Sequence, residues 1–157
     1  MEFSRVQLYD LLNRSDPLWL NGADLSGAML AYAHLYKANL GDANLSNANL
    51  VGAFLNHAFM LGANLTSANL TSANLSEASL RQANLTDAKL TEAMMIRAKL
   101  IKANLRGANL TGANMEGVDL TDADLTYANL YKAQLTGASL TGTIFTGTTM
   151  PDGSLHK

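Results

Sequence analysis

Large apolar residues recur at every fifth position from Leu20 to Met150 without a break in register. These 27 central positions hold leucine 22 times, methionine four times and phenylalanine once. The residue two positions before the central residue is alanine in 23 of the 27 cases, and the exceptions are Leu18, Val118, Thr143 and Thr148. Most of the remaining positions hold residues with short polar side chains. The chain therefore alternates between a Leu and Ala framework and short polar segments.

A period of five matches neither regular secondary structure. A helix returns to the same face every 3.6 residues and a strand every two residues. Residues spaced by five therefore do not line up on one face of a helix or of a strand. The chain must bend once per repeat to return each central residue to the inside. Four bends close a square coil of 20 residues, and stacked coils pair their backbones about 4.8 Å apart. The pattern predicts an all-β solenoid of about seven coils.

The two apolar positions of each repeat differ in size. A narrow coil has room for one large and one small side chain on each side, because close packing tolerates neither voids nor extra methylene groups. The predicted structural core contains Leu25, Leu45, Leu65, Leu85, Leu105 and Leu125, with Ala23, Ala43, Ala63 and Ala83.

Glycine marks the predicted corners. Ten of the 12 glycines lie two positions after a central residue. A type II turn needs a positive φ at its third residue, which glycine adopts without strain. We predict type II turns at these corners, and we expect the glycine-free corners from Ser67 to Lys102 to turn differently.

The repeat Ala-Asn-Leu-Thr-Gly, with variants such as residues 63–67, resembles the signature of the pentapeptide-repeat family. The resemblance extends over the whole repeat region, in 27 unbroken copies. It implies a right-handed quadrilateral β-helix. The Pro-Asp-Gly sequence at residues 151–153 resembles the endings of cyanobacterial family members.

The N-terminal residues 1–17 lie outside the repeat. Ser4 and Gln7 form a capping box, and three leucines that follow share one helical face. We expect a short helix that covers the first coil, because a solenoid must protect the end of its core. The alternative is a helix that binds a partner. The predicted organisation is a capping helix (1–17), a β-helix (18–152) and a tail (153–157).

Composition narrows the cellular context. The chain has no cysteine, so it has neither disulfides nor thiolate metal ligands. The N-terminus does not show the basic segment and following apolar run of a secretory signal. No apolar stretch of the sequence is long enough to span a membrane. We expect a soluble cytoplasmic protein without membrane contact.

Several large apolar residues fall at positions that should face water: Tyr36, Phe54, Phe59, Leu61, Met94, Ile96 and Ile101. Phe54, Phe59 and Leu61 are expected on one coil around a shared corner, with Ile96 and Ile101 two coils further along. A contiguous apolar patch usually marks an interface. Scattered surface apolar residues would need no such explanation.

Basic residues near the second group could form the rim of an interface. The predicted protein-contact patch contains Phe54, Phe59, Leu61, Ile96 and Ile101, with Arg97, Lys99 and Lys102 at its edge. The repeat region holds eight Lys and Arg residues against nine Asp and Glu residues. A nucleic-acid partner is therefore not expected, since no broad basic field exists.

Catalytic chemistry is not expected either. An active site needs convergent polar groups in a concavity, whereas Leu and Ala fill the inside of this solenoid. His34, His57 and His156 have no carboxylate or serine beside them in a catalytic order. We predict no catalytic residue, metal or cofactor.

The favoured interpretation is a non-catalytic scaffold that binds an unidentified protein. A homodimer through the C-terminal coil or the apolar patch is an open alternative, because an exposed sheet edge invites pairing. The resemblance also implies a second hypothesis, since some family members imitate duplex DNA and bind DNA gyrase. That role requires a continuous acidic stripe, and basic residues interrupt the acidic groups of this chain.

Overall fold

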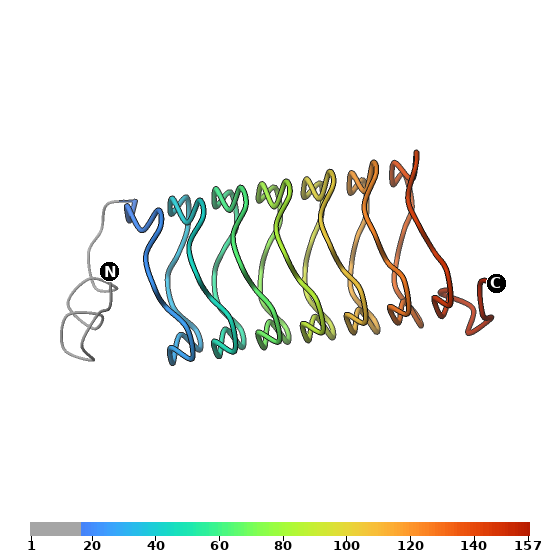
Figure 1. The fold of residues 1–157 in the computed structure, drawn as a ribbon, viewed down its shortest axis with the longest axis horizontal. Helices are drawn as coiled ribbons and strands as arrows, with labels where there is room; N and C mark the ends of the chain where they lie inside the picture. Colours follow the sequence, from blue (N-terminus) through green and yellow to red (C-terminus); the bar gives the residue numbers. More distant parts are fainter. Residues whose placement is uncertain (1–16) are drawn as a thin grey trace.

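The computed structural model describes residues 17–157, which form a rod of stacked coils (Figure 1). Neighbouring coils pair through parallel bridges between residues 20 apart in sequence, as Asp24 does with Asn44. These are isolated bridges rather than longer strands, because the chain bends after every five residues. The described residues contain no helix, and the helix predicted for 1–17 lies outside them apart from Pro17.

Four series of bridged residues define four faces of the rod, and the chain passes through the faces in numerical order. Face 1 carries Trp19, Asn39, Phe59, Ser79, Lys99, Asp119 and Ser139. Face 2 carries Asp24, Asn44, Asn64, Asn84, Asn104, Asp124 and Ile144, and face 3 carries Met29, Asn49, Asn69, Lys89, Asn109, Asn129 and Thr149. Face 4 carries His34, Phe54, Asn74, Met94, Asn114 and Gln134.

All corners between these faces bend in the same way. The N–H three residues after each central residue donates to the central carbonyl, as Ala23 does to Leu20 over 3.0 Å. The third residue of every turn from Gly22 to Gly147 has a positive φ, as a type II turn requires. The expectation of different turns in the glycine-free corners was wrong: Ser67 has a φ of 56° and Lys102 a φ of 57°.

Stacking explains why residues other than glycine accept this conformation. A left-handed L-residue costs about 1–2 kcal/mol. The same corner residue also donates its N–H to the next coil, as Ser67 does to the Thr86 carbonyl over 2.9 Å. A different turn would lose this bond and move the buried side chains on both sides. The coils above and below therefore hold every corner in the same type II turn, whichever residue occupies its third position.

The frequent asparagine has a local role in the corner. The ladder pairs the N–H of Leu65 with the carbonyl of Asn84, but it offers no partner to the N–H of the next residue, Thr66. The side chain of Asn64 accepts that N–H over 3.1 Å, and it also accepts the Thr66 hydroxyl over 2.7 Å. Asn and Thr thus satisfy the backbone that the bend leaves unpaired.

The core is a column of leucine and alanine along each face. Central residues from Leu20 to Leu130 are buried, and the alanines beside them are buried along most of the rod. Near the C-terminal end, Thr143 and Thr148 replace alanine. Their hydroxyls donate to the carbonyls of the preceding coil, so these polar groups are satisfied inside the core.

The glycine at a corner can also make room for the coil beneath it. A Cβ on Gly52 would lie 2.6 Å from the ring of Tyr32, whereas a Cβ on Gly27 would meet nothing within 4 Å. Both glycines have nearly the same positive φ. We expect Gly52→Ala to lower the free energy of unfolding by about 1 kcal/mol more than Gly27→Ala.

Urea unfolding of the two variants measures this difference. In a Tyr32→Ala background the ring is absent, so the two alanine substitutions should have equal effects. A difference that persisted in that background would contradict the role assigned to Tyr32.

Candidate protein-contact surface

The structure places the first part of the predicted patch along one coil, with Phe54 and Phe59 on either side of one corner and Leu61 at the next corner. Phe54 lies on face 4, Phe59 on face 1, and Leu61 begins the corner that follows. Phe59 is 59% exposed and Leu61 is 51% exposed. At comparable positions on face 2 the repeat carries asparagine and threonine, so this corner is unusually apolar.

Histidine and tyrosine side chains extend the apolar corner toward the N-terminal end. His34 stacks on Phe54, with ring centroids 4.9 Å apart and planes inclined by 16°. Tyr36 meets the edge of His57 at a centroid distance of 5.6 Å, and the ammonium of Lys37 lies 5.0 Å from the Tyr36 ring centroid. The residues of these two aromatic contacts are 20 and 21 positions apart in the sequence, so the 20-residue length of a coil was a signal that could have added them to the predicted patch.

The second part of the predicted patch is separated from the first. Face 1 pairs Phe59 with Ser79 and Ser79 with Lys99, so a polar coil lies between the two parts. Ile96 and Ile101 lie on the same coil as Lys99, and both are half-buried rather than fully exposed to water. The structure therefore divides the predicted patch into an aromatic corner and a separate basic row.

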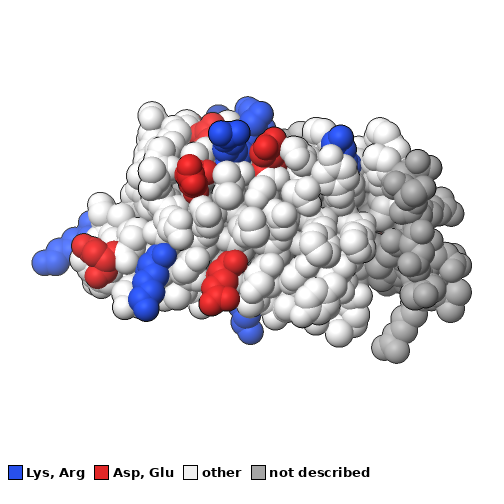
Figure 2. All heavy atoms as spheres, turned by 180° about the vertical axis from the view of Figure 1, so that it is seen from behind, with Lys and Arg blue, Asp and Glu red and all other residues white. Residues whose placement is uncertain are grey.

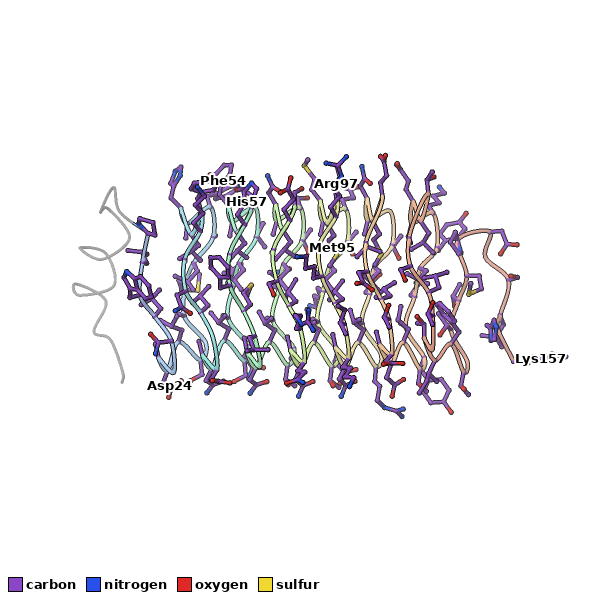
Figure 3. All side chains as sticks on the ribbon, turned by 90° about the horizontal axis from the view of Figure 1, so that it is seen from above. Asp24, Phe54, His57, Met95, Arg97 and Lys157 are labelled. Atoms are coloured by element: carbon purple, nitrogen blue, oxygen red, sulfur yellow. The ribbon has the colours of Figure 1, made fainter. Side chains whose placement is uncertain are left out.

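The basic row crosses face 1 on a single coil. Arg97 and Lys102 occupy the corners at the two sides of this face, and Lys99 lies between them. All three side chains are exposed, and within residues 17–157 none forms an ion pair shorter than 4.0 Å. Figure 3 shows Arg97 projecting from the same side of the rod as Phe54 and His57.

Two contacts between oppositely chargeable side chains occur elsewhere in the described part of the chain, and the one at His57 is an ion pair only when the imidazole is protonated. His57 Nδ1 lies 3.3 Å from Glu77 Oε2, and Arg106 lies 3.2 Å from Asp124. Burial raises the pKa of Asp124, but hydrogen bonds from Thr126 and Arg106 lower it by more, so its net pKa lies below the ordinary value. Asp124 thus remains an anion that the corner stabilises.

The surface charge forms no continuous field of one sign on the side drawn in Figure 2, where basic and acidic groups alternate near the middle of the rod. Among residues 17–157, no three His, Cys, Asp or Glu side chains are grouped so that they could hold a metal ion. No helix in that range is long and apolar enough to cross a membrane.

Comparison with known families identifies the chain. Eight copies of the pentapeptide repeats match within residues 19–47, 43–82, 68–107 and 103–142. The protein belongs to the pentapeptide-repeat family, whose members fold as right-handed quadrilateral β-helices. The fold class predicted from the repeat is confirmed. No curated protein sequence matches the chain.

Solved structures with the same fold include two from cyanobacteria. HetL of Nostoc sp. strain PCC 7120, a pentapeptide repeat protein involved in heterocyst differentiation regulation, is 30% identical, with a TM-score of 0.55. That alignment covers 88% of this chain and 89% of HetL. Rfr23 of Cyanothece 51142 is 38% identical, with a TM-score of 0.51, over 68% of this chain and 63% of Rfr23.

A third similar structure is QnrB1, described as a plasmid-mediated fluoroquinolone resistance protein. It is 20% identical to this chain, with a TM-score of 0.52, over 84% of this chain and 72% of QnrB1. At this identity the similarity concerns the fold alone.

Proposed function

We propose that this chain is a non-catalytic scaffold that binds a partner protein through the aromatic corner formed by Phe54, Phe59 and Leu61. The exposure of these three side chains along one coil carries the proposal. Large exposed apolar groups cost solubility, and where they are contiguous they usually mark an interface. The rigid coils beneath hold them in place, so binding would require little ordering of the scaffold.

The basic row of Arg97, Lys99 and Lys102 supports the same surface. These cations project from face 1 and its two corners, two coils beyond Phe59. Apolar anchors with charged groups at the margin are the usual plan of a protein interface. A partner that spans both regions would cover the polar coil between them, which includes Ser79.

Affinity capture from a cell lysate tests the proposal when wild type is compared with the double variant Phe59→Glu/Leu61→Glu. We expect a partner that wild type retains and the variant loses, because a carboxylate cannot enter an apolar contact without a large desolvation penalty. The matched control is Ser67→Glu/Ser72→Glu. Glu77 and Glu92 already occupy the equivalent corner positions, so the control should fold and bind normally.

The identity of the captured protein distinguishes the two functional hypotheses. If both wild type and the double variant retain gyrase, the result favours DNA mimicry over binding through the aromatic corner. Equal capture of every partner by all three proteins would contradict the proposed surface. Light scattering on the same samples shows whether the partner is a second copy that contacts this corner.

A further inference from the structure

Two rows of opposite charge lie on neighbouring coils of face 1. The coil that follows the basic row places Glu116, Asp119 and Asp122 on the same face and its two corners. These three residues form the acidic row. Lys99 and Asp119 are bridged to each other on the face, and Lys102 and Asp122 hold the same position of the corner beside it. The charge along face 1 therefore changes sign over a single coil.

The charges of both rows are not paired within the described part of the chain. None of the six side chains takes part in an ion pair within residues 17–157. Glu116 and Asp122 are exposed, and Asp119 is half-buried. One oxygen of Asp119 accepts the N–H and the hydroxyl of Thr121, over 3.1 Å and 2.6 Å, which holds the carboxylate in place on the face. Both rows are therefore accessible to a binding partner.

The aromatic corner lies on the same face as the two rows. Phe59 lies two coils before Lys99, and Ser79 lies between them. The coils are stacked in one direction along the rod, about 4.8 Å apart (Figure 1). Apolar, polar, basic and acidic groups thus follow one another along face 1, one kind on each coil.

An α-helix matches the spacing of these four coils. One helical turn rises about 5.4 Å, close to the spacing between coils, so successive turns can face successive coils. Three extended residues cross the face between its corners, a width of about 10 Å, which is also the width of a helix with its side chains. A strand laid along the rod would advance about 3.3 Å per residue and turn alternate side chains away.

We propose that the partner binds face 1 through an amphipathic helix that lies along the rod. An apolar side chain of this helix packs against Phe59 and Leu61, an acidic side chain two turns further meets the basic row, and a basic side chain on the next turn meets the acidic row. The inference rests on the proposed function and adds the chemistry of the partner to it. Complementary charges determine specificity and register more than affinity, so the two rows select the order of groups along the helix.

A synthetic helix tests this proposal. The probe is an alanine-rich peptide of about 20 residues that presents leucines on its first turn, glutamate two turns further and lysine on the turn after that, all on one side. In the control peptide the glutamate and the lysine are exchanged. We expect the control to bind about tenfold more weakly at low salt, because it brings like charges together at both rows. Fluorescence anisotropy of the labelled peptides measures the two affinities.

A charge-swapped protein provides the matched variant. It combines Arg97→Glu, Lys102→Glu, Glu116→Arg and Asp122→Lys. The net charge does not change, and each new residue type already occupies the same repeat position elsewhere, as at Glu77, Arg81 and Lys132, so the variant should fold. We expect this protein to prefer the control peptide. A difference in helicity between the peptides would instead favour the same peptide with both proteins.

The double variant Phe59→Glu/Leu61→Glu separates this inference from the proposed function. If it loses its captured partner while the charge-swapped protein keeps the wild-type peptide preference, the aromatic corner stands as the contact surface and the proposed helix is wrong. Wild type that binds neither peptide, or both equally, would also overturn the helix. Wild type that sediments as two chains only at low salt would assign the rows to a second copy instead.

Discussion

Leu65→Ala is expected to lower the free energy of unfolding by about 2–5 kcal/mol. Leu65 is fully buried in the middle of the rod, between the stacked Leu45 and Leu85. The cavity cannot collapse easily, because backbone hydrogen bonds on both sides hold the coils at a fixed spacing. Urea unfolding followed by circular dichroism measures the loss.

The control for this substitution is Leu140→Ala on the last coil. Leu140 is already partly exposed, so its truncation should cost clearly less than that of Leu65. Equal losses at the two sites would mean that the middle of the rod relaxes around a cavity as readily as its end does.

Ala68→Leu is expected to destabilise the protein at least as much, by the opposite mechanism. Ala68 is fully buried, and its carbonyl accepts the N–H of Lys89 in the next coil over 2.9 Å. Three additional carbon atoms at this site must displace the backbone ladder or force neighbouring leucines out of their rotamers. The midpoint of urea unfolding should shift to lower concentration, with the loss of cooperativity that a displaced coil would cause.

Ala138→Leu provides the matched comparison. Ala138 holds the same repeat position on the last coil, where it is only partly buried and where no further coil of residues 17–157 stacks on face 1. The larger side chain can extend toward the open end, so the expected effect is small. If Ala68→Leu were tolerated as well as Ala138→Leu, the inward packing of the alanine column would be contradicted.

The solenoid could be predicted from sequence because its information is local and repeated. The five-residue spacing of the central positions excludes helix and strand, and the alanines two positions earlier require a narrow interior. The corners were predicted less well. Residues such as Glu92 and Arg97 were not expected at a positive φ, because intrinsic preference alone disfavours it. Neighbouring coils override that preference by supplying hydrogen bonds on both sides.

The candidate surface was predicted in part. The exposure of Phe59 and Leu61 follows directly from their places in the repeat. The separation of Ile96 and Ile101 from that corner depends on what the intervening coil carries, and it emerged only when the faces were assembled. The stacking of His34 on Phe54 likewise joins residues from different coils, so no local pattern contains it.

The sequence by itself determined the architecture of this protein. Leucines at a strict spacing of five can all be buried when the chain bends once per repeat into a square coil. The tertiary structure alone decided the uniform corner conformation, the division of the exposed patch and the stacking of the acidic row on the basic row. Each of these depends on which residues lie above and below one another. Stacking relates positions 20 residues apart, and its consequences for backbone pairing and burial appear only in the assembled rod.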